Sequence, residues 1–200
     1  TLVIRTAGTN CDKETSFAFE QCGSESDLVH INNLVAGEHN LADYQILAIP
    51  GGFTYGDDVA SGKVFAVEIS NALRDMVQKF VDRGGLVIGI CNGFQVLVKT
   101  GLLPEAKFSG SAERSLTLTH NDSHKFEARW VWLEAERNTK CIFVEPGERI
   151  YIPSAHGEGK LVARTPDVIK KLEENGQVVY RYINEDGSEP CYPADPNGSV

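Results

Sequence analysis

Residues 84–101 read Gly-Gly-Leu-Val-Ile-Gly-Ile-Cys-Asn-Gly-Phe-Gln-Val-Leu-Val-Lys-Thr-Gly, and this stretch decides the fold. The short apolar run from Leu86 to Ile90 predicts a strand that is buried on both faces. A helical pattern follows and stops at Gly101, which fits the glycine that commonly ends a helix. Cys91 is therefore expected on the turn from the strand to the helix.

This turn has the spacing of a nucleophile elbow. Gly89 and Gly93 stand two residues before and two residues after Cys91, where a sharp turn leaves little room for Cβ atoms. A helix N-terminus favours the thiolate form of Cys91, and the N–H of Asn92 would point at an oxyanion formed on an attacked carbonyl. The spacing alone leaves a buried structural cysteine as an equal alternative.

Composition narrows the classes of partner. The 200 residues carry a net charge of −9 without a basic run, which argues against nucleic acid and anionic membranes as partners. Five scattered cysteines without a Cys-x-x-Cys pair predict reduced thiols in a cytoplasm rather than disulfides or a zinc site. No window is long and apolar enough to predict a transmembrane helix, and no signal peptide is expected at the start.

The first half of the chain alternates strands and helices. Strands are expected at 2–5, 27–31, 44–49 and 86–90, and the best helix runs from 64 to 81. One face of that helix carries Phe65, Ile69, Leu73, Met76 and Phe80.

This alternation predicts an α/β fold: a doubly wound, mostly parallel sheet with helices on both faces, of the flavodoxin-like kind. Functional sites of such sheets lie at the carboxyl ends of the strands. Pro50-Gly51-Gly52 and Cys91 both follow a predicted strand, so we expect them to be neighbours.

The second half follows another pattern. Residues 115–119 and 125–133 predict an added antiparallel hairpin, whose second strand places Phe126, Ala128, Trp130 and Trp132 on one half-exposed face. Residues 141–144 and 149–152 suggest a second pair of strands. A helix is expected from Pro166, with Thr165 as its N-cap and Gly176 after its end, and a strand at 178–183.

Several segments together carry a resemblance to a known family. Gly-Ile-Cys-Asn-Gly-Phe-Gln (89–95) and Pro-Gly-Gly-Phe-Thr-Tyr-Gly-Asp (50–57) resemble the class I glutamine amidotransferases. The match is more specific to the glutaminase subunit of phosphoribosylformylglycinamidine synthase, an enzyme of purine biosynthesis. Further matching segments are Arg5 with 8–12, 101–104, Ala-His-Gly-Glu-Gly (155–159) and Asn-Gly-Ser (197–199), so that the resemblance spans essentially the whole chain.

The resemblance implies a residue-by-residue site. Cys91 would attack the side-chain amide of glutamine and form a γ-glutamyl thioester, and the N–H groups of Gly52 and Asn92 would form the oxyanion hole. Gly51 and Gln95 would contact the substrate. A turn role for the glycines and a capping role for Gln95 remain open alternatives, and Tyr55, Gly56 and Asp57 fit a pocket edge or a subunit contact equally well.

The chain departs from the family pattern in its catalytic triad. The family triad is Cys-His-Glu, with its last two members in a C-terminal His-Pro-Glu, and nothing similar follows Asn197. We therefore interpret residues 1–200 as a single amidotransferase domain that lacks that segment. His156 and Glu158 have a suitable His-x-Glu spacing. Because the family carries this segment in addition to its triad, pocket lining or a partner contact is favoured over catalysis.

The expected partners follow from the same resemblance. The chain shows no nucleotide-binding glycine pattern, so no cofactor is expected on it, and ATP and Mg²⁺ are expected on a large synthetase subunit. Glutamine and a small third subunit complete the expected partners. No metal site is predicted, since His120 and His124 flank a turn without further ligands at suitable spacing. Two other classes stay open: a cysteine hydrolase of the DJ-1/PfpI-like or esterase type, and a non-catalytic binding subunit.

Overall fold

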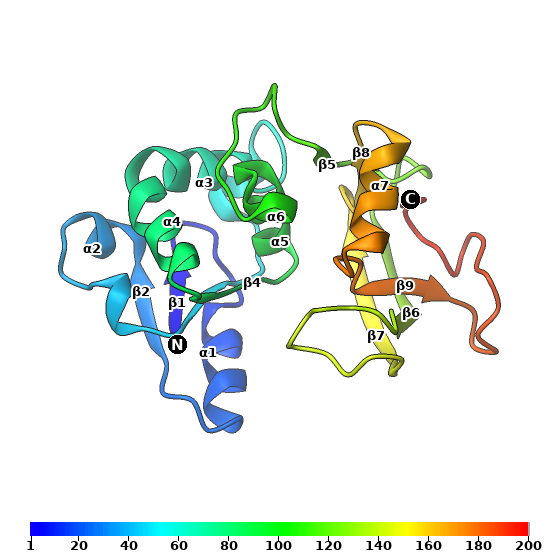
Figure 1. The fold of residues 1–200 in the computed structure, drawn as a ribbon, viewed down its shortest axis with the longest axis horizontal. Helices are drawn as coiled ribbons and strands as arrows, with labels where there is room; N and C mark the ends of the chain where they lie inside the picture. The colour runs from blue at the N-terminus through cyan, green and yellow to red at the C-terminus, as the bar shows by residue number, and fades with distance from the viewer. Residues whose placement is uncertain (200) are drawn as a thin grey trace. The chain divides into compact units, whose positions relative to one another are not determined.

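The computed structural model describes residues 1–199, and the chain divides into two compact units. The first unit comprises Thr1–Arg114, and the second begins at Ser115. Each unit has its own sheets and is described by itself (Figure 1). The interpretation of residues 1–200 as one amidotransferase domain stays a prediction, and Val200 lies outside the described residues.

A parallel sheet of four strands forms the centre of the first unit. The strands are β1 (Leu2–Arg5), β2 (Asp27–His30), β3 (Ile46–Ile49) and β4 (Leu86–Gly89), in the order β2-β1-β3-β4. All three pairings are parallel, and the register of the last pair places Ile49 opposite Gly89. The α/β fold with a parallel sheet is confirmed.

Helices connect these strands and cover the sheet (Figure 1). They are α1 (Asp12–Gln21), α2 (Ile31–Val35), α3 (Lys63–Glu68), α4 (Arg74–Asp82), α5 (Asn92–Thr100) and the short α6 (Leu102–Glu105), with 3₁₀ turns at Leu41–Asp43 and Thr54–Asp57. The core lies between sheet and helices. Its completely buried members include Leu2, Ile4, Ile31, Leu34, Leu41, Phe65, Leu73, Phe80 and Val96.

The prediction that the Leu86–Ile90 strand is buried on both faces is wrong. The residues of β4 are only half-buried, and Ile90 is 43% exposed. The reason is the position of the strand, because β4 pairs only with β3 within the described part of the chain and so forms an edge of this sheet.

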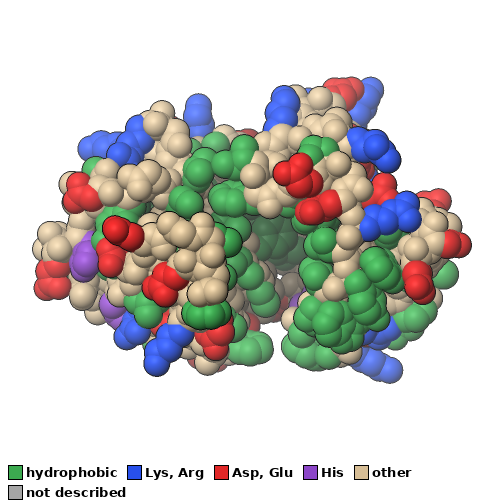
Figure 2. Space-filling model, turned by 90° about the horizontal axis from the view of Figure 1, so that it is seen from below, with side chains coloured by type: hydrophobic (Ala, Val, Ile, Leu, Met, Phe, Trp, Pro, Cys, Tyr) green, Lys and Arg blue, Asp and Glu red, His purple; other side chains and the backbone are tan. Residues whose placement is uncertain are grey.

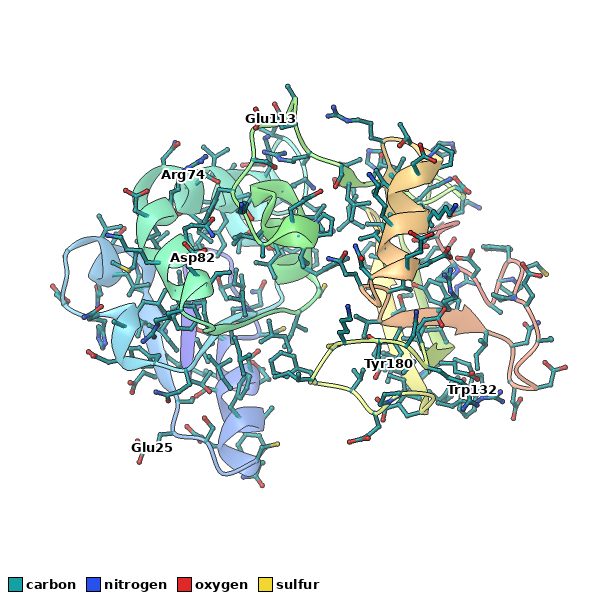
Figure 3. The ribbon with its side chains drawn as sticks, in the orientation of Figure 1. Glu25, Arg74, Asp82, Glu113, Trp132 and Tyr180 are labelled. Carbon is teal, nitrogen blue, oxygen red and sulfur yellow. The ribbon has the colours of Figure 1, made fainter. Side chains whose placement is uncertain are left out.

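The predicted long helix forms with one correction of register. A single turn of π-helix (Ile69–Leu73) joins α3 to α4. Figure 3 labels Arg74 and Asp82, the first and last residues of α4. A π turn contains one extra residue, which alters which side chain of the next turn faces the core, while Phe80 is buried as predicted. Val77 is therefore buried in place of the predicted Met76, which is only partly buried.

This shift of register can be measured as a difference in stability. Val77→Ala should lower the free energy of unfolding by about 2 kcal/mol, since it removes two methyl groups from a packed core. The matched control is Val67→Ala on the same helical run, where the side chain is 45% exposed. The control should change the free energy by less than about 0.5 kcal/mol in urea denaturation. Equal losses for the two variants would contradict the register.

The second unit contains two antiparallel sheets. One pairs β5 (Leu116–Thr119) with β8 (Lys160–Ala163), and the other has the order β7-β6-β9. The remaining elements of the second unit are the strands β6 (Glu127–Ala135), β7 (Arg149–His156) and β9 (Tyr180–Ile183) and the helix α7 (Pro166–Glu174). Helix α7 begins after Thr165 and is followed by Gly176 at a positive φ, as predicted.

The antiparallel addition is present, but neither predicted strand pair forms. Residues 115–119 pair with β8 instead of β6, because the completely buried Asn121 hydrogen-bonds through its backbone N–H to Gly157 O and holds this turn beside the end of β7. The true hairpin is β6–β7, joined by the long loop 136–148. Residues 141–144 belong to that loop and form no strand.

The alternation predicted for β6 is confirmed. Val131 and Ala135 are buried, whereas Trp130 is 58% exposed. On the exposed face Tyr151 stacks between Trp130 and Trp132, with ring centroids 5.1 and 4.8 Å apart. Hydrophobic side chains are visible on the surface of this unit in Figure 2, and Figure 3 labels Trp132 on β6.

Candidate active site

Cys91 occupies a strained turn between β4 and α5. Its backbone angles are φ 54° and ψ −109°, a region that residues other than glycine rarely adopt. Such a conformation costs on the order of 1–3 kcal/mol and persists only where the surrounding structure enforces it. This geometry confirms the predicted elbow.

Two glycines allow the elbow to pack against the sheet. A Cβ atom on Gly93 would lie 1.9 Å from the carbonyl oxygen of Ile49 in β3. A Cβ atom on Gly89 would lie 2.5 Å from the carbonyl oxygen of Gly93. Both positions therefore require glycine for lack of space, as the sequence predicted.

The end of β3 lies beside Cys91. Because β3 and β4 are adjacent and parallel, their carboxyl ends meet, and a Cβ atom on Gly51 would be 3.3 Å from the Cβ of Cys91. The backbone N–H groups of Asn92 and Gly52 both lie near enough to the Cys91 sulfur to lower the pKa of its thiol. The predicted proximity of Gly52 and Cys91 is confirmed.

Burial and the backbone N–H groups change the pKa of the Cys91 thiol in opposite directions. Burial raises the pKa of the Cys91 thiol although the residue reaches the surface, and the hydrogen bond from the Asn92 N–H opposes this rise. The nearby Cys11 and Asp57 raise the pKa further, and the N–H of Gly52 lowers it. The N–H of Asn92 at the start of α5 thus favours the thiolate, as expected, but desolvation is the larger effect and the net change in the pKa is upward.

The loop after β1 supports the loop that carries Gly52. The N–H of Cys11 donates to Gly51 O at 3.2 Å, and the N–H of Phe53 donates to Gly8 O at 2.9 Å. Gly52 has φ 139°, and a Cβ atom there would lie 2.4 Å from the backbone nitrogen of Asn10. Two segments that carried the resemblance, 8–12 and 50–57, are thus packed against each other.

The loop from Phe53 onward contains a network that the sequence did not predict. Tyr55, Gly56 and Asp57 all have positive φ. The Tyr55 hydroxyl lies 2.7 Å from Thr6 Oγ1 and 2.6 Å from Glu68 Oε2, and burial is the main cause of its raised pKa. These contacts hold the loop between β1 and α3.

Gln95 is buried behind the elbow. Its side chain is one helical turn from Cys91, and its Oε1 accepts a hydrogen bond of 3.0 Å from Asn92 Nδ2. The structure therefore groups five predicted site residues in the first unit, namely Gly51, Gly52, Cys91, Asn92 and Gln95. The contact of Gln95 agrees with a supporting role, and its contact with substrate stays a prediction.

His156 and Glu158 belong to the second unit. His156 is the last residue of β7, and Glu158 lies in the turn to β8. Asn121 Nδ2 donates to Lys125 O and His156 O, so Asn121 Oδ1 is the acceptor of the 3.0 Å contact with His156 Nδ1. The proton of neutral His156 therefore sits on Nδ1, and burial lowers the pKa of the ring.

The other nitrogen of His156 has a neighbour of its own. Asn197 Nδ2 lies 3.5 Å from His156 Nε2 and 3.0 Å from the Tyr182 hydroxyl. Ser199 accepts from the N–H of Leu161 at 3.0 Å, which ties the C-terminal segment to β8. The Ala155–Gly159 and 197–199 segments of the resemblance thus come together, and Asn121, in the turn between the predicted strands 115–119 and 125–133, bonds to His156 and Gly159.

Two negative findings apply to residues 1–199. They contain no group of three or more His, Cys, Asp or Glu side chains arranged to hold a metal ion. Within the same range, no helix has both the length and the apolar character needed to cross a membrane.

Comparison with known proteins identifies the family. Residues 1–200 match a family described as the CobB/CobQ-like glutamine amidotransferase domain. The chain belongs to this glutamine amidotransferase family. The resemblance noted in the sequence is thereby confirmed.

Individual relatives agree with this family. The chain is 50% identical to the phosphoribosylformylglycinamidine synthase subunit PurQ of Dehalococcoides mccartyi, over 100% of this chain and 76% of that protein. It is 41% identical to PurQ of Methanococcus maripaludis, over 99% of this chain and 72% of that protein. Among solved structures, PurLQS from Thermotoga maritima matches with a TM-score of 0.69 and 34% identity, over 92% of this chain and 74% of that one.

The packing of the elbow can be tested by filling it. Gly93→Ala should lower the free energy of unfolding by more than about 3 kcal/mol, because the new methyl group meets backbone that cannot move aside. Gly110→Ala is the matched control, since a Cβ atom there has only Glu113 Oε2 nearby, at 3.9 Å. That control should stay within about 1 kcal/mol of the parent in urea denaturation. A mild effect of Gly93→Ala would show that the elbow is not packed on β3.

Proposed function

We propose that this chain is the glutaminase subunit of phosphoribosylformylglycinamidine synthase, which hydrolyses glutamine and delivers the ammonia to a synthetase partner. The observation that carries the proposal is the strained Cys91 at φ 54°, which faces the N–H groups of Gly52 and Asn92. A nucleophile beside two backbone donors fits attack on an amide carbonyl.

The reaction would proceed in two steps. The Cys91 sulfur attacks the side-chain carbonyl carbon of glutamine, and the negative charge on the oxygen is stabilised by the N–H groups of Gly52 and Asn92. The C–N bond then breaks, ammonia leaves with a proton, and a γ-glutamyl thioester remains on Cys91. Water attacks the thioester, which releases glutamate and restores the thiol.

The raised pKa of Cys91 makes a general base necessary. At neutral pH the thiol is mostly protonated, so a base must remove its proton and return one to the departing ammonia. Such help accounts for about 10²- to 10⁴-fold in rate. By family resemblance the base is the histidine of a Cys-His-Glu triad.

We do not assign that base to His156. The atom that a base would use is Nε2, and Asn197 Nδ2 lies 3.5 Å from it. Nδ1 is held by the neutral amide of Asn121, which fixes the ring within the turn between β7 and β8. These contacts favour a structural, pocket-lining or partner-binding role for His156, and we propose the same for Glu158 in the adjoining turn.

The remaining parts of the reaction belong to partners. We propose that ATP and Mg²⁺ bind a large synthetase subunit and that a small third subunit completes the complex. PurQ is named as a subunit in the relatives, and the similar solved structure is titled PurLQS, which supports this arrangement. Five free cysteines suit the reducing conditions of a cytoplasm, where we place the reaction.

Glutamate release tests the proposal. Cys91→Ala should abolish glutamine hydrolysis by the full-length protein with its synthetase partner, since no thioester can form. The glutamine-like electrophile diazo-oxo-norleucine should label Cys91 and spare the four other cysteines. Cys22→Ala is the matched control, because Cys22 is an exposed cysteine after α1 and should be dispensable. A parent protein that binds the synthetase without releasing glutamate would instead indicate a non-catalytic binding subunit.

A further inference from the structure

The loop that carries Gly52 is strained at several residues after it. Tyr55 has φ 55°, Asp57 has φ 54° and Val59 has φ 72°, and none of them is a glycine. Residues other than glycine rarely have a positive φ, and they keep it only where surrounding contacts determine the backbone conformation. The contacts that hold this loop therefore decide where the Gly52 N–H points.

The side chain of Asn92 makes such contacts. Its Oδ1 accepts from the Thr54 N–H at 3.2 Å and from the Thr54 hydroxyl at 2.6 Å. Its Nδ2 donates to Asp57 Oδ1 at 2.9 Å and to Gln95 Oε1 at 3.0 Å. All four hydrogen-bonding positions of the amide are occupied. Asn92 and Thr54 are 1% and 2% exposed, so water does not compete for the bonds between these two residues.

Asp57 extends the network to the next helix. Its Oδ1 also accepts from the N–H of Gly62 at 3.1 Å, directly before α3. The side chain of Asn92, the first residue of α5, thus holds the strained loop at both Thr54 and Asp57.

We propose that the Asn92 side chain is a positioning group that clamps Thr54 and Asp57 and thereby holds the Gly52 N–H at the Cys91 sulfur. The inference rests on the proposed oxyanion hole. In this arrangement one residue serves both donors: the backbone of Asn92 provides the first N–H, and its side chain, together with the bonds of Gly51 and Phe53 to the loop after β1, holds the loop that provides the second.

The clamp should matter most in the transition state. Donors stabilise an oxyanion only when they lie about 2.7–3.1 Å from it, and a shift of about 1 Å can cost 10²-fold in rate. Substrate binding in the ground state depends less on that distance. A loosened clamp should therefore lower kcat and leave KM nearly unchanged.

Thr54→Val provides a conservative test, because it keeps the shape of the side chain and removes the hydroxyl that donates to Asn92. We expect kcat for glutamine to fall about 10- to 100-fold with KM within about twofold. Thr54→Ser keeps the hydroxyl and should retain most of kcat. Thr100→Val is the matched control on α5, since it removes a buried hydroxyl that bonds Leu97 O at 2.8 Å. This control should keep the parent kcat.

A double-mutant cycle shows whether Thr54 acts through Asn92. Asn92→Leu removes all four side-chain bonds, so Thr54→Val should have no further effect on kcat in that background. Independent, multiplicative losses would contradict the clamp. If Asn92→Leu does not fold, the comparison of Thr54→Val with Thr54→Ser still decides.

A second measurement does not require turnover. The Gly52 N–H lowers the pKa of the Cys91 thiol, so loss of its alignment should move the pH midpoint of Cys91 alkylation by iodoacetamide upward. Thr54→Val should show this shift, whereas Thr54→Ser and Thr100→Val should not. The neighbouring Cys11 and Asp57 also act on this thiol, and Thr54→Val leaves the Asn92–Asp57 bond in place.

The two measurements separate the clamp from the proposed function. Parent values of both kcat and the alkylation midpoint in Thr54→Val would overturn the clamp. A parent protein that never hydrolyses glutamine would overturn the proposed function, and the alkylation midpoints would still decide whether the clamp exists.

Discussion

The contact between Gly93 and the carbonyl of Ile49 is the constraint on which the candidate site depends. It brings the first turn of α5 so close to β3 that a methyl group at residue 93 would lie 1.9 Å from that oxygen. The chain can make this approach only by turning sharply at Cys91, which is why this residue has φ 54°. The same contact places Cys91 beside the end of β3, where the loop with Gly52 begins. Strain and reactivity therefore have one structural cause.

The surroundings of Cys91 disfavour the thiolate in the resting protein, although two backbone N–H groups are in place to stabilise negative charge. Burial raises the pKa of Cys91, and two backbone N–H groups reduce this effect without reversing its direction. During attack, negative charge would move from sulfur to the carbonyl oxygen of the substrate, and the same donors could follow it.

Most of the first unit and of its site could be predicted from the sequence, because the signals are local. Gly89, Cys91 and Gly93 define the elbow by spacing, and the alternation of apolar runs with helical patterns defines the parallel sheet.

The errors come from features without a local signal. The π turn at Ile69–Leu73 moved the buried face from Met76 to Val77, and the edge position of β4 left its residues half-buried. In the second unit, nothing in the sequence marks Asn121 as the residue that bonds to the end of β7, where residues 115–119 pair with β8 instead of forming the expected hairpin. The side-chain role of Asn92 depends on residues 38 and 35 positions away, which no pattern within the elbow reveals.

The account has one central claim: the Gly52 and Asn92 N–H groups stabilise an oxyanion formed by attack of Cys91 on glutamine. A crystal structure of the covalent adduct between Cys91 and a glutamine-derived electrophile tests it most directly. We expect the adduct oxygen that stands for the oxyanion to lie within about 3.1 Å of both backbone nitrogens, with the Asn92 side chain still bonded to Thr54 and Asp57. An adduct oxygen that points to solvent, or an adduct formed on another cysteine, would contradict the claim.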